Sequence, residues 1–479
     1  MTETTNQPTT LPLDFIGIKK AIPLLLLVFN AFYGYSQMYF DDGRMVYAGD
    51  STVEGSYQSL GINPANLGRV SQRRKGGAIL QVGGNFYSDG LDFQQVIGLT
   101  FREDSLGEAL KNEIVSQTAS GEFAYEGNLD VNWFSYSYAS PTLGGIAVNV
   151  QDRLASTATI PNEALGIMLL GENSAAVQNA ANISDLSGLG DGADVSYSHI
   201  RAVRIGYGRM IARVRGGNGG GDFRNELFRI YAGGTLQLLW GVGYFNGEIQ
   251  NGNFSSKSTF ADLYRVNYGQ LTIGDPLLQR QLLNTVGQGV AFDLGLGVDI
   301  GEKISFGASI VDVGGLTWDE GIVTTSTDFV TLVDSSQQGL INSYQISQEA
   351  GNFLDLGTQG TAPSFETLLN AQTRLNFAYR LNDRMRLGGD MVIPLRSANP
   401  EAIDIEAATL TGSFSWAIVP QYIYLSSGFI YNGSFGARLP LGISANFGGA
   451  TFNISTADLL TLAQRRRPLA SLSVSISGL

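Results

Sequence analysis

A strict alternation of side-chain size runs from Val290 to Ile300 and restricts this part of the chain to β-structure. Every second residue is large and apolar, and the residues between them are Ala, Gly or Asp. Because successive side chains of a β-strand point to opposite faces of a sheet, this stretch predicts a strand with one apolar face and one small, polar face. The alternation resumes at Ile304 after the short connection Gly301–Lys303, so the two stretches together predict a β-hairpin.

A second predicted hairpin repeats this design. Arg374–Leu381 and Met385–Ile393 alternate in the same way on either side of the connection Asn382–Arg384. Arginine, asparagine and aspartate occupy the small face, and charged groups need water or a partner, so this face is expected to meet water. Further strands are predicted at Gly77–Tyr87, Phe93–Phe101, Asn128–Ala139, Gly145–Arg153, Val195–Ile211, Leu227–Trp240, Leu410–Ile418, Tyr422–Tyr431, Gly436–Phe447 and Ser471–Ser477.

Alternation with period two is typical of both β-sandwiches and β-barrels. The strands have roughly 10 residues and their connections alternate between very short and very long, which favours a membrane barrel. An open sheet edge in hydrocarbon would leave backbone groups without hydrogen bonds, so such a sheet has to close. The sequence therefore predicts an all-β fold, a transmembrane antiparallel β-barrel of about 14 strands, with a soluble secreted β-protein as the alternative. We expect short periplasmic turns and longer extracellular loops.

The N-terminal region has the pattern of an export signal. Lys19 and Lys20 precede the apolar run Ala21–Phe32, and the small residues Gly34 and Ser36 follow. The run is shorter than the roughly 20 residues of a spanning helix, so we predict a cleaved signal peptide over residues 1–36, with an N-terminal membrane anchor as the alternative. Together with the barrel, this predicts the outer membrane of a Gram-negative bacterium, with outer-membrane lipid and the barrel-insertion machinery as partners.

Composition excludes several other classes of protein. Only 15% of the residues are charged, against about 25% in a typical soluble protein. Cysteine is absent, which excludes disulfides and thiolate metal sites. The net charge of −13 disfavours nucleic acid as a partner. The only histidine, His199, has no acidic partner that the sequence identifies, and Asp185, Asp191 and Asp194 lack the spacing of a calcium loop, so we predict no catalytic site, no metal site and no cofactor.

Four segments between the predicted strands do not alternate. Ser105–Gln117, Pro161–Ala181, Phe260–Gln288 and Val323–Leu369 are predicted to be helical inserts that fold over or into the mouth of the barrel. One of them contains a group of large apolar residues that either lines a site for a hydrophobic ligand or forms the core of a small cap. These residues are Leu165, Ile167, Met168, Leu169 and Leu170.

The motif Asn63-Pro64-Ala65-Asn66 lies between the export signal and the first predicted strand. Proline fixes φ, removes a donor and disfavours helical geometry for the residue before it, and asparagine side chains hydrogen-bond their own turn. The motif therefore suits either a plug element in a watery lumen or a turn that joins the N-terminal segment to the barrel wall.

The stretch Gly61–Leu67 resembles the N-terminal segment of the FadL-type outer-membrane barrels, a superfamily of long-chain fatty acid and aromatic hydrocarbon channels that also includes a type IX secretion barrel. Ala291–Trp318 and Arg374–Leu395 are similar to an uncharacterised Bacteroidota barrel family within that superfamily. The resemblance implies a lumen segment over residues 37–75 and a barrel over residues 76–479. Asn66 stands where those transporters generally have glycine, so the gating role of the segment does not carry over directly.

Two functions are compatible with this sequence. One is a FadL-like channel for a small hydrophobic molecule. The other is a non-transporting barrel that serves as a docking component of an envelope or protein-secretion complex, with a protein of the envelope as its partner.

Overall fold

A computed structural model gives the fold of most of the chain from Ser56 onward. The described residues are 56–70, 74–88, 107–118, 121–180, 186, 188–215, 226–261, 284–328, 360–361, 363–395, 408–420, 422–432, 436–447, 450–456, 458–459 and 469–477. The predicted signal peptide (1–36), the predicted strand Phe93–Phe101 and most of the predicted insert Phe260–Gln288 lie outside the described residues.

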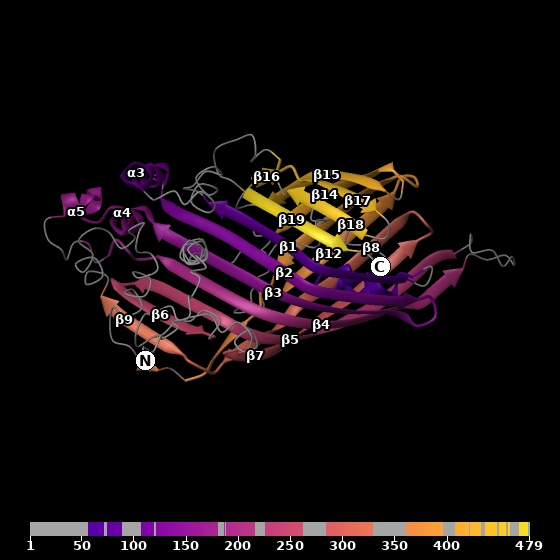
Figure 1. The fold of residues 1–479 in the computed structure, drawn as a ribbon, viewed down its shortest axis with the longest axis horizontal. Helices are drawn as coiled ribbons and strands as arrows, with labels where there is room; N and C mark the ends of the chain where they lie inside the picture. The colour runs from indigo at the N-terminus through magenta and orange to yellow at the C-terminus, as the bar shows by residue number, and fades with distance from the viewer. Residues whose placement is uncertain are drawn as a thin grey trace, which may run out of the picture.

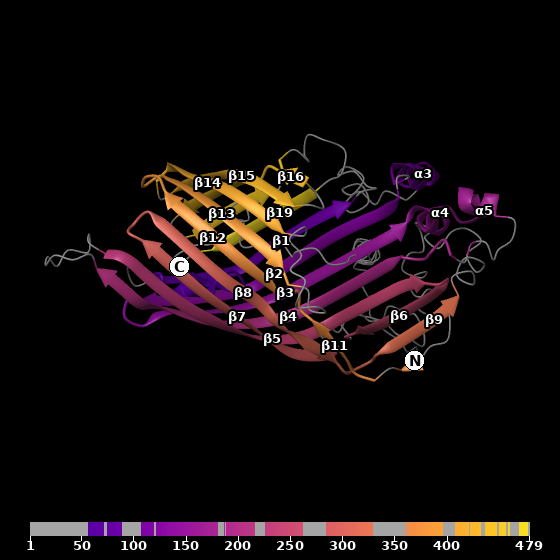
Figure 2. The same cartoon turned by 180° about the vertical axis from the view of Figure 1, so that it is seen from behind.

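Fourteen of the strands in the described part of the chain form one closed antiparallel ring (Figures 1 and 2), which confirms the predicted all-β barrel and its strand number. In order around the ring they are β1 (Arg74–Ser88), β2 (Glu122–Ser140), β3 (Gly144–Pro161), β4 (Asp194–Arg215), β5 (Glu226–Gln250), β7 (Gly287–Ile300), β8 (Ile304–Trp318), β12 (Gln372–Arg380), β13 (Met385–Pro394), β14 (Thr409–Val419), β15 (Ile423–Asn432), β17 (Leu441–Phe447), β18 (Ala450–Thr456) and β19 (Leu469–Ser477).

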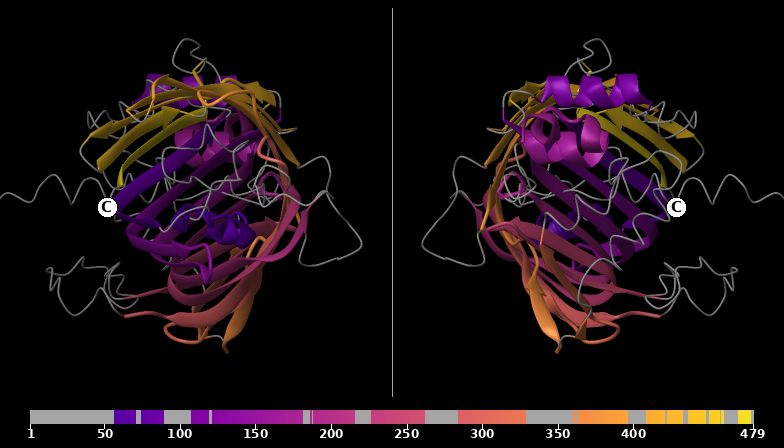
Figure 3. Two further views of the ribbon diagram at one scale, coloured as in Figure 1. Left: turned by 90° about the vertical axis from the view of Figure 1, so that its right-hand side faces the viewer. Right: turned by 90° about the vertical axis from the view of Figure 1, so that its left-hand side faces the viewer.

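The ring closes between its first and last strands. β1 pairs with β2 on one side and with β19 on the other, for example Gly83 opposite Ser473. Each strand of the ring thus has a neighbour on both sides, so the sheet has no free edge around the ring. Figure 3 shows the ring from its two ends.

The two predicted hairpins form with the expected registers. Ile300 lies opposite Ile304 across the turn at Gly301, which has a φ of +59° that glycine adopts without strain. In the other hairpin, the Asn382 side-chain oxygen accepts hydrogen bonds from the backbone N–H groups of Arg384 and Met385. Both connections are the short turns that the alternation predicts.

Five short strands extend the sheet beyond the ring: β6 (Asn253–Phe260), β9 (Val323–Asp328), β10 (Gly360–Thr361), β11 (Phe365–Leu368) and β16 (Gly436–Arg438). β5 pairs with β7 as far as Gly241 and with β6 from Gly243 onward. The helical prediction for Val323–Leu369 is therefore wrong for its described parts, which are β9, β10 and β11. The Thr- and Ser-rich stretch of β9 is β-branched and finds a ladder on β6, which no local pattern revealed.

The barrel wall has an apolar outer face and a mostly polar inner face. On β7, Leu294 is 67% exposed, whereas its neighbour Asp293 is fully buried. The same alternation holds on β12, where Leu375 and Phe377 are exposed and Arg374 and Asn376 are buried. The buried face is the one that surrounds the lumen.

The helices of the described residues are short. α3 (Glu108–Gln117), α4 (Asn162–Leu170), η4 (Gly171–Asn173) and α5 (Ala175–Asn179) gather at one end of the molecule. The short helices η2 (Tyr57–Ser59) and η3 (Pro64–Gly68) lie inside the ring, nearer the strand ends that the short turns join. Within the described residues, none of these helices has the length and apolar composition that crossing a membrane requires.

Candidate functional site

The segment from Tyr57 to Arg69, here called the plug segment, fills part of the lumen. Its residues are buried, and its short helices lie inside the ring in the left-hand view of Figure 3. Asn63 caps η3, because its side-chain oxygen accepts a hydrogen bond from the N–H of Ala65 at 3.0 Å. Pro64 follows at the first helical position, where its missing N–H costs nothing.

Glycines of the wall make room for the plug segment. A Cβ atom at Gly233 of β5 would stand 2.3 Å from the carbonyl oxygen of Pro64, and one at Gly295 of β7 would stand 2.0 Å from the Asn63 side-chain oxygen. Real Cβ atoms do not approach other atoms so closely, so any larger residue would displace the segment. Gly145 of β3 and Gly208 of β4 meet the backbone of the segment in the same way.

An ion pair fixes one end of the plug segment to the wall. The Arg69 guanidinium lies 2.8 Å from the carboxylate of Asp299 on β7, and it donates a second hydrogen bond to the carbonyl oxygen of Phe306 on β8 at 2.8 Å. The Cζ atom of this guanidinium also lies 5.4 Å from the ring centre of Tyr231, within the range of a cation–π contact. Arg69 and Asp299 are both buried, and Arg229 lies 3.7 Å from the same carboxylate, so loss of Arg69 would leave Asp299 with only this longer ion pair.

Hydrogen bonds to side chains and to strand backbone fix the remainder of the segment. The Asn63 amide donates to the carbonyl oxygen of Leu296 at 3.0 Å, and the Ser309 hydroxyl donates to the carbonyl oxygen of Ile62. The Gln81 amide donates to the Tyr57 hydroxyl at 3.1 Å. The plug segment is therefore bonded to both the β1 side and the β7–β8 side of the wall.

A second layer of polar side chains crosses the lumen beside the plug segment. Arg153 on β3 makes a bidentate contact with Asp312 on β8, at 3.2 and 3.0 Å. The strands β4, β5 and β7 lie between them in the ring, so this contact spans the lumen instead of following the wall. Both side chains are buried.

Four further side chains complete this polar layer. Arg204 donates to Gln151 at 2.8 Å and to Gln237 at 2.9 Å. Gln237 in turn donates to Asp293 at 2.6 Å and to Asp312 at 2.9 Å. The five strands β3, β4, β5, β7 and β8 are thus joined across the lumen by one buried network.

A bulge in β8 supports the network. Asp293 of β7 stands opposite both Val311 and Asp312, and Asp312 has a φ of +59°. The N–H of Asp312 donates to the carboxylate of Asp293 at 2.9 Å, so a side chain replaces the ladder bond that the bulge interrupts.

Next to the polar layer, the lumen face becomes apolar. Leu239 follows Gln237 by two residues on the same face of β5, and it packs with Leu316 and Trp318 of β8. The ring of Trp318 is fully buried, lies 5.3 Å from the ring of Tyr244 and stacks on that of Phe365 at 6.3 Å. We call Leu239, Tyr244, Leu316, Trp318 and Phe365 the apolar layer.

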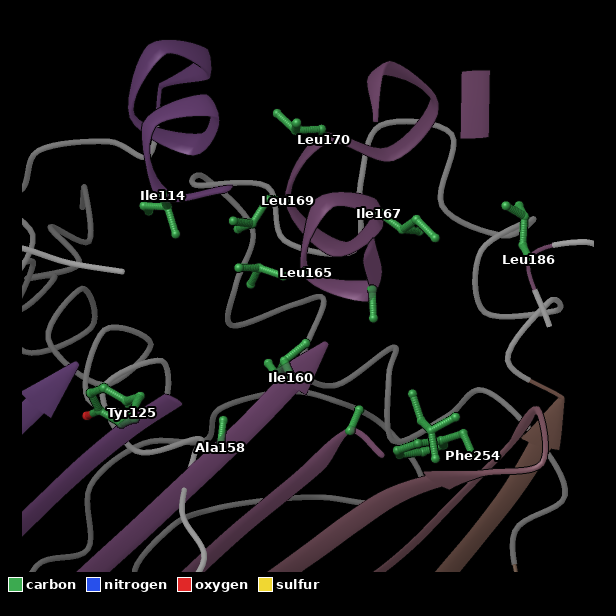
Figure 4. Close-up of a cluster of buried hydrophobic side chains, with 13 residues drawn as sticks. Ile114, Tyr125, Ala158, Ile160, Leu165, Ile167, Leu169, Leu170, Leu186 and Phe254 are labelled. Atoms are coloured by element: carbon green, nitrogen blue, oxygen red, sulfur yellow. The ribbon is translucent and has the colours of Figure 1, made fainter. Parts of the chain in front are cut away.

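The predicted ligand-lining residues lie elsewhere, in the helical cap (Figure 4). Leu165, Ile167, Leu169 and Leu170 are buried and Met168 is partly buried, and all five pack in a cluster with Ile114 of α3 and with strand ends. The lumen-facing residues of β3, such as Arg153, have odd numbers, and the pairing of β3 with β4 has no register shift. Ala158 and Ile160, two strand residues of this cluster, have even numbers and therefore lie on the other face of β3. The five residues therefore pack on the sheet face opposite to the one that surrounds the lumen.

The structure gives His199 an acidic neighbour that the sequence did not identify. Asp152 of β3 lies 3.8 Å from the His199 ring nitrogen. The carboxylate already accepts two hydrogen bonds from Arg201, at 2.7 and 2.8 Å, and one from the indole N–H of Trp133 at 2.9 Å. Such an arrangement holds three strands together and leaves the carboxylate committed to Arg201.

The sequence matches one family model over residues 75–457, described as a family of unknown function, DUF5723. No curated protein matches the sequence. Among solved structures, a FadL homologue from Pseudomonas aeruginosa has 12% identity and a TM-score of 0.42, with 94% of this chain and 98% of that chain covered. The Pseudomonas putida toluene transporter TodX has 11% identity and a TM-score of 0.41, with 94% of this chain and 97% of that chain covered.

Proposed function

The chain belongs to the DUF5723 family, and we propose that it is an outer-membrane barrel that carries a small hydrophobic molecule through a lumen held closed by its plug segment. The resemblance of Gly61–Leu67 to the N-terminal segment of FadL-type barrels supports the proposal. So does the closed ring, since only a sheet without edges is stable in hydrocarbon.

The outer face of the ring supports insertion in a membrane. Large apolar side chains are exposed on strands all round the barrel, where a soluble protein would carry charge. They include Ile79, Phe134, Ile146, Ile205, Leu236, Phe292, Leu294, Phe377, Leu410, Phe429, Ile443 and Phe452. Outer-membrane lipid is the partner that these side chains suit, and the insertion machinery is the partner that assembles such a barrel.

The apolar layer is the observation that carries the proposed cargo. A lumen used only for water and ions has no need of Leu239, Leu316 and Trp318 in contact on its inner face. A hydrophobic molecule that reaches these side chains gains the burial of its own apolar surface. Tyr244 and Phe365 are only half-buried, so they are the members of the layer that a ligand meets first.

The plug segment and the polar layer would then act as the barriers to the hydrophobic molecule. The Arg69–Asp299 ion pair holds the first, and the Arg153–Asp312 contact holds the second. Passage of the hydrophobic molecule requires at least one of them to move.

Binding of N-phenyl-1-naphthylamine to the protein in mild detergent tests the proposed cargo. This apolar fluorophore brightens when it leaves water, and we expect saturable binding that Leu316→Gln weakens at least tenfold. Leu143→Gln, in an exposed turn, is the matched control and should bind like the unmodified protein. Binding that does not saturate, or that Leu316→Gln leaves unchanged, would exclude the apolar layer as a ligand site.

One observation favours the second candidate function, a non-transporting docking barrel. The plug segment and the polar layer both cross the lumen, and each is held by its own hydrogen bonds. A barrel that transports nothing has no need to open either of them. If the protein carries no ligand and is recovered with an envelope protein in stoichiometric amount, native mass spectrometry of the purified barrel will favour this candidate over transport.

A further inference from the structure

A row of polar side chains follows β12 on its lumen face. Gln372, Arg374 and Asn376 stand at every second position, and each is at least 95% buried. Asp390 of β13 lies directly opposite Asn376 in the ladder and contacts the Arg374 guanidinium. We call these four residues the β12 row.

Much of the hydrogen-bonding capacity of the β12 row is unused within the described part of the chain. Both polar atoms of Gln372 and both of Asn376 have no partner, and the same is true of Nε and Nη1 of Arg374 and of one oxygen of Asp390. Folded proteins seldom bury polar groups in this state, because each loses its bonds to water and gains none in return. Seven such atoms in four neighbouring side chains point to polar molecules that the row binds.

The β12 row begins beside the plug segment and ends beside the polar layer. A Cβ atom at Gly307 would lie 2.3 Å from the Asn376 oxygen and 2.7 Å from the Asn63 amide nitrogen, so these two amides flank the same glycine. At the other end, Gln372 is paired with Val311, the residue before Asp312. The row therefore runs along β12 from the level of the plug segment to the level of the polar layer.

The wall next to the row continues the polar surface. On β14, β15, β17 and β18 the buried inner positions are occupied mainly by small hydroxyl residues. They include Thr411, Ser413, Ser426, Ser444 and Ser455. Short hydroxyl side chains leave more space than the arginines and glutamines of the polar layer, and they bond to water readily.

The chemistry of the row selects one kind of solute. Arg374 and Asp390 neutralise each other, so the row has no net charge to attract an anion or a cation. Its free atoms are a mixture of donors and acceptors, which matches adjacent hydroxyl groups, each of them both donor and acceptor. A hydrocarbon would leave all seven atoms without a partner, so the hydrophobic cargo is not expected to follow this path.

We propose that the β12 row forms a hydrated track that conducts small neutral polyols past the plug segment. This activity is independent of the apolar layer and goes beyond the transport of a hydrophobic molecule. Water occupies the row when no polyol is present, and a polyol exchanges with that water hydroxyl by hydroxyl.

Osmotic swelling of proteoliposomes tests this proposal, with erythritol as the permeating solute and raffinose as the solute that is too large. We expect liposomes with the unmodified protein to swell in erythritol at least fivefold faster than protein-free liposomes, and no faster in raffinose. Gln372→Leu combined with Asn376→Leu should abolish most of the difference, because leucine removes four of the free polar atoms. Gln250→Leu with Asn253→Leu, at an exposed hairpin, is the matched control and should swell like the unmodified protein.

Two results would overturn the proposal. One is erythritol permeation by the unmodified protein at the rate of empty liposomes, and the other is an unchanged rate in the double variant. A heat-modifiable gel band verifies that each variant is folded. If the double variant does not fold, the near-isosteric Gln372→Met replaces it, and a rate equal to that of the unmodified protein would contradict the proposal in the same way.

Discussion

Asp312→Asn tests whether the network across the lumen stabilises the barrel. Asparagine keeps the size of the side chain and tolerates the positive φ of this position, so the backbone of the bulge is preserved. The substitution removes the charge that faces Arg153, at 3.0 Å, and Arg204, at 3.7 Å. It also turns one of two acceptor oxygens into a donor that opposes the guanidinium groups.

The expected loss of stability is large because the network is buried. Removing one partner of a buried ion pair typically costs about 3–5 kcal/mol, since the remaining charge has neither water nor a counterion. Asp293 lies in the same network and offsets part of this loss, so we expect a value near the lower end, about 3 kcal/mol. That corresponds to a change in the unfolding equilibrium of roughly 100-fold.

Urea unfolding of the barrel in phospholipid vesicles, followed by tryptophan fluorescence, measures this loss. Arg153→Gln and the double variant complete a cycle with Asp312→Asn. The double variant should be less destabilised than the sum of the single variants, because no unpaired charge of this contact remains. Asp383→Asn in the exposed turn after β12 is the control, with an expected change within about 0.5 kcal/mol.

Either of two results would refute this reasoning. A loss below about 1 kcal/mol for Asp312→Asn would mean that water enters the layer and compensates the guanidinium groups. Additive effects of the two single variants would mean that Arg153 and Asp312 do not act as a pair in the membrane-inserted protein.

Three further substitutions probe the plug segment and the cap. Gly233→Val places a Cβ 2.3 Å from the Pro64 carbonyl oxygen and should expel the plug segment. Planar-bilayer recordings should then show a larger conductance. Gly234→Val is the control, because its Cβ would have no neighbour closer than 3.5 Å and the conductance should not change. Arg69→Ala should speed amide hydrogen exchange of the plug segment at least tenfold while the strands keep their protection, and uniform exchange would contradict this. Leu165→Ala should destabilise the cap by about 2–5 kcal/mol and raise exchange in α3 and α4, and unchanged exchange there would show that the residue is not part of a packed core.

The strands were predictable because their signal is local. Alternation alone locates β7, β8, β12 and β13, since every strand of a barrel has one face toward the lumen and one away from it. The same rule fails for Val323–Asp328 and Phe365–Leu368, where the strands are short and the partner that stabilises them is not adjacent in sequence. Their polar, Thr-rich composition is common to strands and loops.

The lumen site was predictable only in part. The Asn63–Asn66 motif was identified from proline and asparagine chemistry, and Asn63 makes the turn bond expected of it. The role of Arg69 was not identified, because Asp299 is 230 positions away and only the closed ring brings the two together. Acidic residues on the small face of a predicted strand, such as Asp293 and Asp299, were the available signal for buried partners.

The cap shows why helical spacing is insufficient to assign a ligand site. Leu165 and its neighbours have the composition of a hydrophobic pocket and equally that of a packed core. The two differ only in whether another element covers them, and here α3 and the strand ends do. The apolar layer was missed for the converse reason: its members come from β5, β8 and β11 and form no apolar run in the sequence.

The seam between β1 and β19 also has a consequence for how the barrel assembles. Arg74–Ser88 and Leu469–Ser477 are separated by most of the chain, so their ladder is the pairing in the ring that joins the most distant segments. Contacts between such distant segments slow folding, because the intervening chain has to be ordered first. Until then β1 exposes unpaired backbone that can pair with any other strand nearby. We therefore expect closure by the final strand to be a slow step of assembly, and the free edge of β1 to be exposed to aggregation until this step is complete.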